Sequence, residues 1–176
     1  MVAHRVALKF PDLVRSAYLY EGAAALEKSE AQQAEHTTLR NEIIGKSMSL
    51  AKEEKFAEAA GALLDGVIGK EGFFNSLPEG PQKVIGAKGK LLADYYETTG
   101  NPAVKYTCDQ IKDSSVPTLL VVGDNTREFF SVALGEHYEP CLGSERLLEV
   151  SGANHVWPGA KFQDFVESVH GFASKH

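Results

Sequence analysis

The sequence predicts an α/β fold, in which a few parallel strands alternate with helices. Segment 116–122 (VPTLLVV) is apolar on both faces, as expected for a parallel strand that helices cover on both sides. Helix-like and strand-like segments alternate around it, which favours a parallel sheet. Five apolar residues recur with helical spacing near the C-terminus and mark one face of a last helix: Phe162, Phe165, Val166, Val169 and Phe172.

The first part of the chain predicts a helix, a strand and a long helical block. Residues 1–9 are amphipathic and predict a helix. Residues 14–20 (VRSAYLY) carry β-branched and aromatic side chains and predict a strand that stops at Glu21. From residue 23 to about residue 114 the apolar residues recur with helical spacing, and one helix is expected over 82–96.

The remainder of the chain predicts two more strands. After the strand at 116–122, the loop Gly123-Asp124-Asn125-Thr126 leads into an expected helix over 127–137. The short run 147–150 (LLEV) predicts a third strand, and a loop then leads to the last helix. Three parallel strands are therefore expected, with the helical block between the first and the second.

Charge and hydropathy exclude several classes of partner. The chain has 176 residues and a formal net charge of -6, and its Lys and Arg residues are scattered rather than clustered. We therefore expect no nucleic acid and no membrane surface among its partners. No apolar run approaches the ~20 residues that a membrane-spanning helix needs. No signal peptide is expected either, because residues 1–5 lead straight into an amphipathic pattern.

The two cysteines indicate a reducing compartment. Cys108 and Cys141 lie far apart in the sequence and belong to no CxxC motif. We expect two reduced thiols in a cytoplasmic protein. The histidines and cysteines show no spacing typical of metal ligands, so we expect neither a metal site nor an organic cofactor.

The segment Gly152-Ala153-Asn154-His155 is the strongest candidate for a functional site. It lies on the loop between the third expected strand and the last helix. The backbone positions a histidine on such a loop, yet the imidazole stays accessible to a ligand. A general base needs this placement, which makes His155 the candidate catalytic base.

Almost the whole chain resembles the C-terminal portion of an α/β-hydrolase. The segment MVAHRVALKFPDLVRSAYLYEG resembles the helix after the nucleophile and the next strand, and VPTLLVVGDNT resembles the penultimate strand with its loop. The segment LLEVSGANHVWPGAKFQDFVESVHGFAS resembles the last strand, the catalytic-histidine loop and the closing helix. The resemblance implies a hydrolase core formed by residues 1–22 and 115–176, and a helical cap formed by residues 23–114. It also implies hydrolysis of small apolar ester-like substrates, with His155 as the general base.

The resemblance leaves two candidates for the acid that orients His155. Most members of the family place an aspartate three residues after the glycine of the penultimate strand's loop, a position that Thr126 occupies here. Asp124 lies nearby, directly after Gly123. A second arrangement in the family places the acid at the end of the strand before the cap, where Glu21 lies. Either carboxylate would accept the imidazole N–H and hold the ring in one tautomer.

The expected nucleophile is absent from the sequence. The family carries its serine in a G-x-S-x-G turn, and no serine of this chain has glycine two residues away on both sides. We expect an N-terminally truncated hydrolase that is inactive alone. The alternative is a non-catalytic fragment that binds a small apolar ligand or a protein partner. In either case the strand at 14–20 would be an open sheet edge, which favours self-association or pairing with an N-terminal complementing chain.

Overall fold

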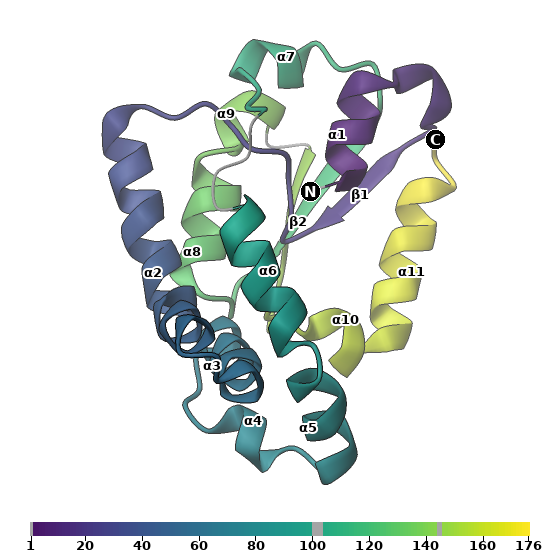
Figure 1. Cartoon of the computed structure of the whole chain (residues 1–176). Coiled ribbons are helices and arrows are strands. Elements are labelled where there is room, and N and C mark those ends of the chain that lie inside the picture. The colour runs from purple at the N-terminus through teal and green to yellow at the C-terminus, as the bar shows by residue number, and fades with distance from the viewer. Residues whose placement is uncertain (1, 100–103, 144–145) are drawn as a thin grey trace. The chain divides into compact units, whose positions relative to one another are not determined.

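A computed structural model of the chain describes residues 2–99, 104–143 and 146–176. Three strands form one parallel sheet in the order β1-β2-β3, with bounds Ala17–Tyr20, Thr118–Gly123 and Leu147–Val150 (Figure 1). This sheet with its surrounding helices confirms the predicted α/β fold class. Among the described residues, no helix is long and apolar enough to cross a membrane.

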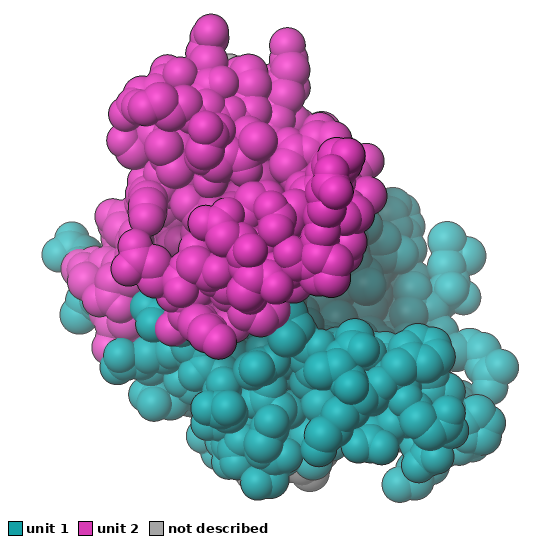
Figure 2. Space-filling model, turned by 90° about the horizontal axis from the view of Figure 1, so that it is seen from below, with its two compact units in different colours: residues 1–32, 104–176 teal, residues 33–103 magenta. Residues whose placement is uncertain are grey.

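The chain divides into two compact units. Residues 1–32 and 104–176 form unit 1, and residues 33–103 form unit 2 (Figure 2). All three strands belong to unit 1, whereas the described part of unit 2 is helical. The sequence predicts an insert over 23–114. The structure assigns residues 23–32 and 104–114 of this range to unit 1. Leu26 and Tyr106 pair there in an isolated parallel bridge.

Helices cover both faces of the sheet in unit 1. Parallel register places Leu19 beside Leu120, and both side chains point to the face that holds the main core cluster. Tyr18 and Tyr20 point to the opposite face, where the ring of Tyr18 contacts the last helix. The helices found among the described residues of unit 1 are α1 (Val2–Lys9), η1 (Pro11–Leu13), α7 (Cys108–Lys112), α8 (Glu128–Phe130), η2 (Ser131–Glu136), α9 (Glu139–Leu142), α10 (Trp157–Ala160) and α11 (Phe162–Ala173).

The first strand is shorter than predicted. A strand over 14–20 was expected, but β1 starts at Ala17, whose N–H donates to the carbonyl oxygen of Pro117 at 2.8 Å. Proline has no N–H, so the neighbouring strand cannot extend the ladder backwards beyond this point. The predicted helix over 127–137 is present, but η2 within it has π-helical geometry. The third strand and the last helix lie where the sequence predicts them.

In unit 2 the helices pack closely, and one predicted helix is interrupted. The expected helix over 82–96 is two helices, because α5 ends at Gly86 and α6 begins at Gly89. A Cβ atom at Gly89 would lie 1.8 Å from the carbonyl oxygen of Phe56, so the chain passes directly against α3 at this point. The described helices of unit 2, the first of which begins in unit 1, are α2 (Glu30–Lys52), α3 (Phe56–Ile68), α4 (Phe73–Ser76), α5 (Glu79–Gly86) and α6 (Gly89–Thr99).

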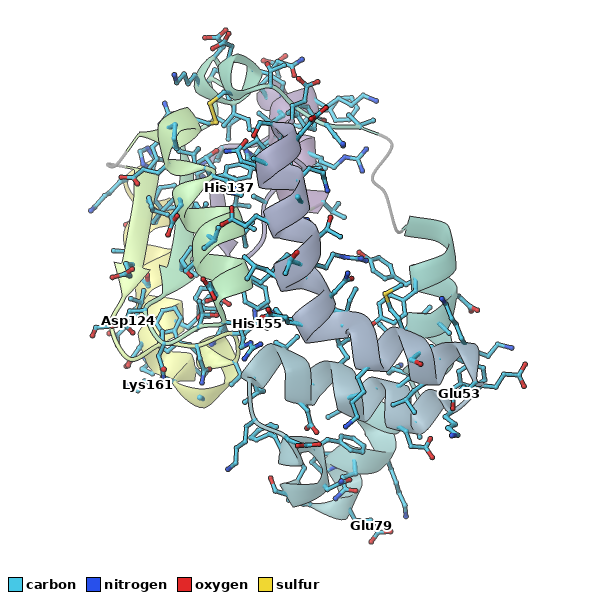
Figure 3. The ribbon with its side chains drawn as sticks, turned by 90° about the vertical axis from the view of Figure 1, so that its left-hand side faces the viewer. Glu53, Glu79, Asp124, His137, His155 and Lys161 are labelled. Atoms are coloured by element: carbon cyan, nitrogen blue, oxygen red, sulfur yellow. A yellow bond between two sulfur atoms is a disulfide. The ribbon has the colours of Figure 1, made fainter. Side chains whose placement is uncertain are left out.

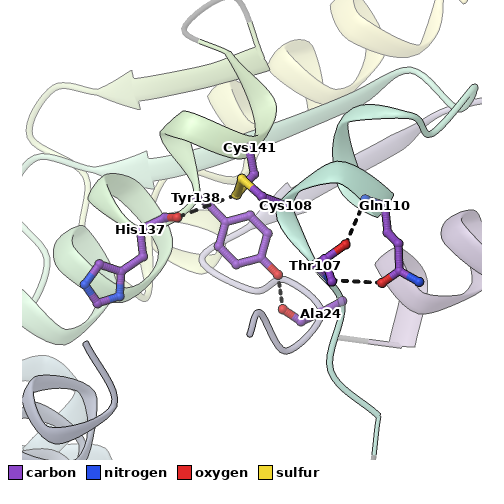
Figure 4. Close-up of a disulfide and its surroundings, with 7 residues drawn as sticks. All are labelled: Ala24, Thr107, Cys108, Gln110, His137, Tyr138 and Cys141. Atoms are coloured by element: carbon purple, nitrogen blue, oxygen red, sulfur yellow. Dashed lines mark hydrogen bonds between the residues drawn. A yellow bond between two sulfur atoms is a disulfide. The ribbon is translucent and has the colours of Figure 1, made fainter. Parts of the chain in front are cut away.

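The expectation of two reduced cysteines is wrong. Cys108 at the start of α7 and Cys141 in α9 form a disulfide, with their Cα atoms 4.7 Å apart (Figure 4). The two residues are 33 positions apart in sequence, and only the packing of α7 against α9 brings them together. Spacing along the chain therefore contains no signal for this pair.

His4 fills a buried position in α1. Its Nδ1 atom accepts a hydrogen bond from the Ala24 N–H at 3.1 Å, which links α1 to the segment that follows β1. The ring must be neutral to accept this bond. Burial lowers the pKa of His4 from the ordinary 6.5 to about 4.

We predict that His4 makes folding sensitive to mild acid. Between pH 6.5 and about pH 4 the unfolded chain binds a proton at His4 and the folded chain does not. The free energy of unfolding therefore falls as the pH drops through this window, by up to about 3 kcal/mol from this residue. His4→Asn keeps an acceptor for Ala24 and does not titrate. Urea unfolding at several pH values should show a flatter pH dependence in this variant, whereas His170→Asn, at an exposed position of α11, should leave the dependence unchanged.

Candidate active site

Glu21 lies at the carboxyl end of β1 and points its side chain into the protein. Its side chain has no exposed surface, and its N–H extends the ladder by donating to the Val121 carbonyl oxygen at 2.9 Å. The backbone has φ 42°, in the left-handed region that side chains other than glycine rarely adopt. Such a conformation costs about 1–2 kcal/mol, so other interactions must hold Glu21 there.

Three donors surround the Glu21 carboxylate. The Gly123 N–H donates to Oε1 at 3.0 Å, and the Thr126 hydroxyl donates to Oε2 at 3.0 Å. His155 contacts Oε2 through Nδ1 at 2.7 Å. A carboxylate can only accept hydrogen bonds, so the proton of this pair lies on Nδ1 of the imidazole. The three donors come from the ends of β2 and β3, and together they compensate the burial of a charged group.

A stacked ring and the hydrogen bonds of its loop hold His155 in place after β3. The ring of Phe130 stacks on the imidazole with centroids 4.3 Å apart and planes inclined by 20°. The loop before it is anchored because the Tyr20 hydroxyl donates to the Asn154 carbonyl oxygen. Asn154 also accepts the Val156 N–H through Oδ1 at 3.0 Å. The His155 side chain is 35% exposed, so its ring is reachable from solvent while its Nδ1 edge is fixed.

Asp124, the second candidate acid, does not contact His155. Its Oδ2 accepts the Ser151 hydroxyl at 2.9 Å, and its Oδ1 accepts the Gly152 N–H at 2.6 Å. Asp124 and His155 lie near the same end of the sheet (Figure 3), but Asp124 binds the start of the loop whose other end carries the histidine. The structure therefore pairs His155 with Glu21, and Asp124 joins the loop after β2 to the loop after β3.

A glycine allows these two loops to touch. A Cβ atom at Gly123 would lie 2.2 Å from the carbonyl oxygen of Ala153, which leaves room only for glycine. The Asn125 N–H donates to the same carbonyl oxygen at 2.9 Å. This contact places the histidine loop against the end of β2, within reach of the Glu21 carboxylate.

Two residues of the site, Thr126 and Phe130, could not be assigned a role from the sequence. Thr126 was noted only because it occupies the position of the family's usual aspartate, yet its hydroxyl binds Glu21. The threonine itself was a usable sequence signal. A hydroxyl at the position of the usual aspartate can donate to a carboxylate that another strand provides, as Glu21 does here. Phe130 left no signal in the sequence, because an apolar residue on a helix is most often part of the core.

Burial and charge also act on Tyr20, the last residue of β1, which directly precedes Glu21. The pKa of the Tyr20 hydroxyl is raised, first by burial and then by the negative charge of Glu21. Tyr20 therefore stays protonated and continues to donate to the loop that carries His155. Its ring also packs against Trp157 at the start of α10.

This arrangement can perform general acid–base chemistry. With the proton held on Nδ1, the lone pair of His155 lies on Nε2, and no hydrogen bond joins Nε2 to another of the described residues. A neutral imidazole in this state can accept a proton there, and the Glu21 carboxylate stabilises the imidazolium that forms. Among the residues that the structure describes, no group of three or more His, Cys, Asp or Glu side chains could hold a metal ion.

Comparisons with known proteins assign no family. No model of a known protein family matches the sequence, and no curated protein matches it significantly. Among solved structures, the chain is similar to the crystal structure of NosK from Streptomyces actuosus, with 20% sequence identity and a TM-score of 0.49. The match covers 99% of this chain and 64% of NosK, so the chain spans less than two thirds of that protein. Similarity at this level assigns no function.

We predict that Glu21→Gln reverses the tautomer of His155. The Gly123 N–H requires an acceptor at the Oε1 position, so the side-chain amide would place its NH2 group at the position of Oε2. This NH2 group would donate to Nδ1, and the imidazole proton would move to Nε2. Long-range ¹H–¹⁵N NMR spectra of the imidazole in alkaline buffer, at about pH 8.5, distinguish the two tautomers.

The same variant should destabilise the fold by about 1–3 kcal/mol in urea unfolding, because it weakens three hydrogen bonds to a buried side chain. Asp124→Asn is the matched control, since Asp124 bonds the histidine loop but not the imidazole. An unchanged Nδ1–H tautomer in Glu21→Gln would contradict the assigned pairing of His155 with Glu21.

Proposed function

We propose that this chain carries the acid–base part of a hydrolase active site. The observation that carries the proposal is the buried Glu21 carboxylate at 2.7 Å from Nδ1 of His155. In this proposal His155 is the general base and Glu21 orients it. Asp124 is a loop residue and takes no part in the proton transfer.

The resemblance to α/β-hydrolases supplies the reaction class. In that reaction a nucleophile attacks an ester carbonyl, the histidine takes the nucleophile's proton, and it then protonates the leaving group. The substrate proposed is a small apolar ester, and residues 33–103 would act as the cap that selects it. No metal or organic cofactor is part of this proposal.

The nucleophile is not among residues 1–176 in the G-x-S-x-G form. We therefore propose that polypeptide outside these residues supplies it and that the chain alone is inactive. An acid–base pair without nucleophile and oxyanion donors retains little of a hydrolase's rate. Cytoplasmic localisation stays a prediction, and the disulfide removes the reduced cysteines on which it partly rested.

We predict that activity appears only when a nucleophile is supplied. The chain and its His155→Ala variant should both hydrolyse p-nitrophenyl butyrate no faster than buffer. The same chain, expressed with upstream in-frame polypeptide that carries a G-x-S-x-G motif, should be active. In that longer protein His155→Ala should lower kcat by about 10³-fold or more, and Glu21→Gln by about 10²-fold or more, because each removes part of a coupled proton transfer.

Two outcomes would contradict this proposal. Activity of the chain alone that depends on His155 would mean that residues 1–176 contain a nucleophile. A longer protein that carries the motif but hydrolyses no ester would favour the alternative, a non-catalytic protein that binds a small apolar ligand or a protein partner. Asp124→Asn is the control in both assays, because its effect should stay within about tenfold.

The free edge of β1 favours a partner strand. Ala17 and Glu21 donate their N–H groups toward β2, so by strand alternation the N–H groups of Tyr18 and Tyr20 face the other edge. No strand among the described residues pairs with that edge. We propose that a second copy of the chain occupies it in the isolated protein, because two antiparallel β1 strands present matching donors and acceptors to each other.

We predict concentration-dependent dimerisation, measured by light scattering after size-exclusion chromatography. Leu13 lies four residues before β1 and is 80% exposed, so Leu13→Lys should weaken the dimer because it replaces an apolar side chain beside the free edge with a charge that must stay hydrated. Leu91→Lys is the matched control, because Leu91 is 66% exposed on α6 in the other unit. A monomer at all concentrations would contradict the proposed partner.

A further inference from the structure

The two segments that join unit 2 to unit 1 are paired with each other in unit 1. The Tyr106 N–H donates to the Ala25 carbonyl oxygen at 2.8 Å, and the Glu27 N–H donates to the Tyr106 carbonyl oxygen at 2.8 Å. Segment 24–27 leads toward residues 33–103, and segment 104–107 leads back from them. We call these two segments the paired connections.

Side chains hold the outgoing connection at Ala24. Its N–H donates to Nδ1 of His4, and its carbonyl oxygen accepts the Tyr138 hydroxyl. Both partners are buried. Ala24 lies three residues after Glu21, so this anchorage begins directly beyond the candidate active site.

A disulfide holds the returning connection. Thr107 caps α7 and exchanges hydrogen bonds with Gln110, and Cys108 follows as the first residue of that helix. Cys108 is joined to Cys141 in α9 (Figure 4). The returning connection therefore reaches a covalent link two residues after Tyr106.

The residues that hold the two connections, Tyr138 and Cys141, lie on the same turn of helix. Tyr138 immediately precedes α9 and Cys141 lies three residues later, a spacing that places two side chains on the same face of a helical turn. Tyr138 binds the outgoing connection, and Cys141 binds the returning one. Leu26, Ile111 and Cys141 are buried in the same core cluster. One short helix thus holds the two ends of the insert together.

We propose that the Cys108–Cys141 disulfide is a redox-sensitive lock on the paired connections. Two backbone hydrogen bonds do not make a stable ladder by themselves, because even a complete two-stranded hairpin is marginal in water. The covalent link supplies the restraint that the ladder lacks. Reduction would let the connections separate, so that residues 33–103 remain tethered by unpaired chain. This inference goes beyond the proposed hydrolase chemistry and does not depend on it.

The reducing partner is a dithiol, either a small molecule or a protein. Cys141 is buried and Cys108 is partly exposed, so a thiolate of the dithiol would attack Sγ of Cys108. Cys141 would leave as a thiolate and take up a proton. The second thiol of the dithiol would then displace Cys108 and form the dithiol's own disulfide. In total the protein gains two electrons and two protons, and the dithiol is oxidised.

Amide hydrogen exchange followed by NMR tests the lock in the full chain. The quantity to measure is the exchange rate of the Glu27 and Tyr106 amides relative to those of Leu120 and Val121 in β2. Dithiothreitol should raise this ratio by about tenfold or more, because the connections would open without unfolding of the sheet. A thiol titration confirms that both cysteines are reduced.

A variant that lacks both cysteines tests the proposed lock without a reductant. The double variant Cys108→Ser, Cys141→Ser should show the same raised ratio as the reduced protein, and dithiothreitol should not change it further. If the double variant does not fold, reduction of the native chain alone decides the matter. An unchanged ratio after complete reduction would overturn the proposal, as would equally faster exchange throughout β2, which would indicate general destabilisation.

Discussion

The buried carboxylate of Glu21 connects the ends of all three strands. It follows β1, accepts the N–H of the last residue of β2 and holds the histidine from the loop after β3. A charged group without exposed surface is stable only when donors replace its water, and three donors do so here. The site and the sheet are therefore interdependent, because each donor stays in place only while the strands remain paired.

The unusual backbone of Glu21 follows from the same constraint. A left-handed φ turns the chain sharply after β1, so that the carboxylate points across the end of the sheet instead of along the strand. Glycine would adopt this turn more easily but would leave three donors without an acceptor. The strain is tolerated because the hydrogen bonds to the carboxylate offset it. Local strain at a site of this kind is a common mark of function.

Two carboxylates near the site bind different parts of the histidine loop. Asp124 binds Ser151 and Gly152 at the start of the histidine loop, whereas Glu21 binds the imidazole itself. Gly123 lets the two loops approach to backbone contact. The segment after Glu21 is then held at Ala24 by His4 and Tyr138, so the region between the sheet and the helical insert is tied at several points in unit 1.

Much of the sheet could be predicted, because local patterns determine it. The apolar run 116–122 predicts a strand that helices cover on both faces, and the alternation with helices favours parallel strands; β2 forms there. The close approach of Gly89 to Phe56, beside the break between α5 and α6, could not be predicted, because the two residues lie far apart in sequence. The disulfide was mispredicted for the same reason, since Cys108 and Cys141 meet only through the packing of two helices.

By itself the sequence determined the fold class, the position of His155 after the last strand and two candidate carboxylates for it. The fold class and the position of His155 follow from residue type, period and order along the chain, which act locally, whereas the two carboxylates follow from the resemblance to α/β-hydrolases. Only the tertiary structure decided between Glu21 and Asp124 as the neighbour of His155, added Thr126 and Phe130, and joined the cysteines. Each of those choices depends on a distance between segments that the chain brings together from separate strands and helices, and a linear pattern contains no such distance.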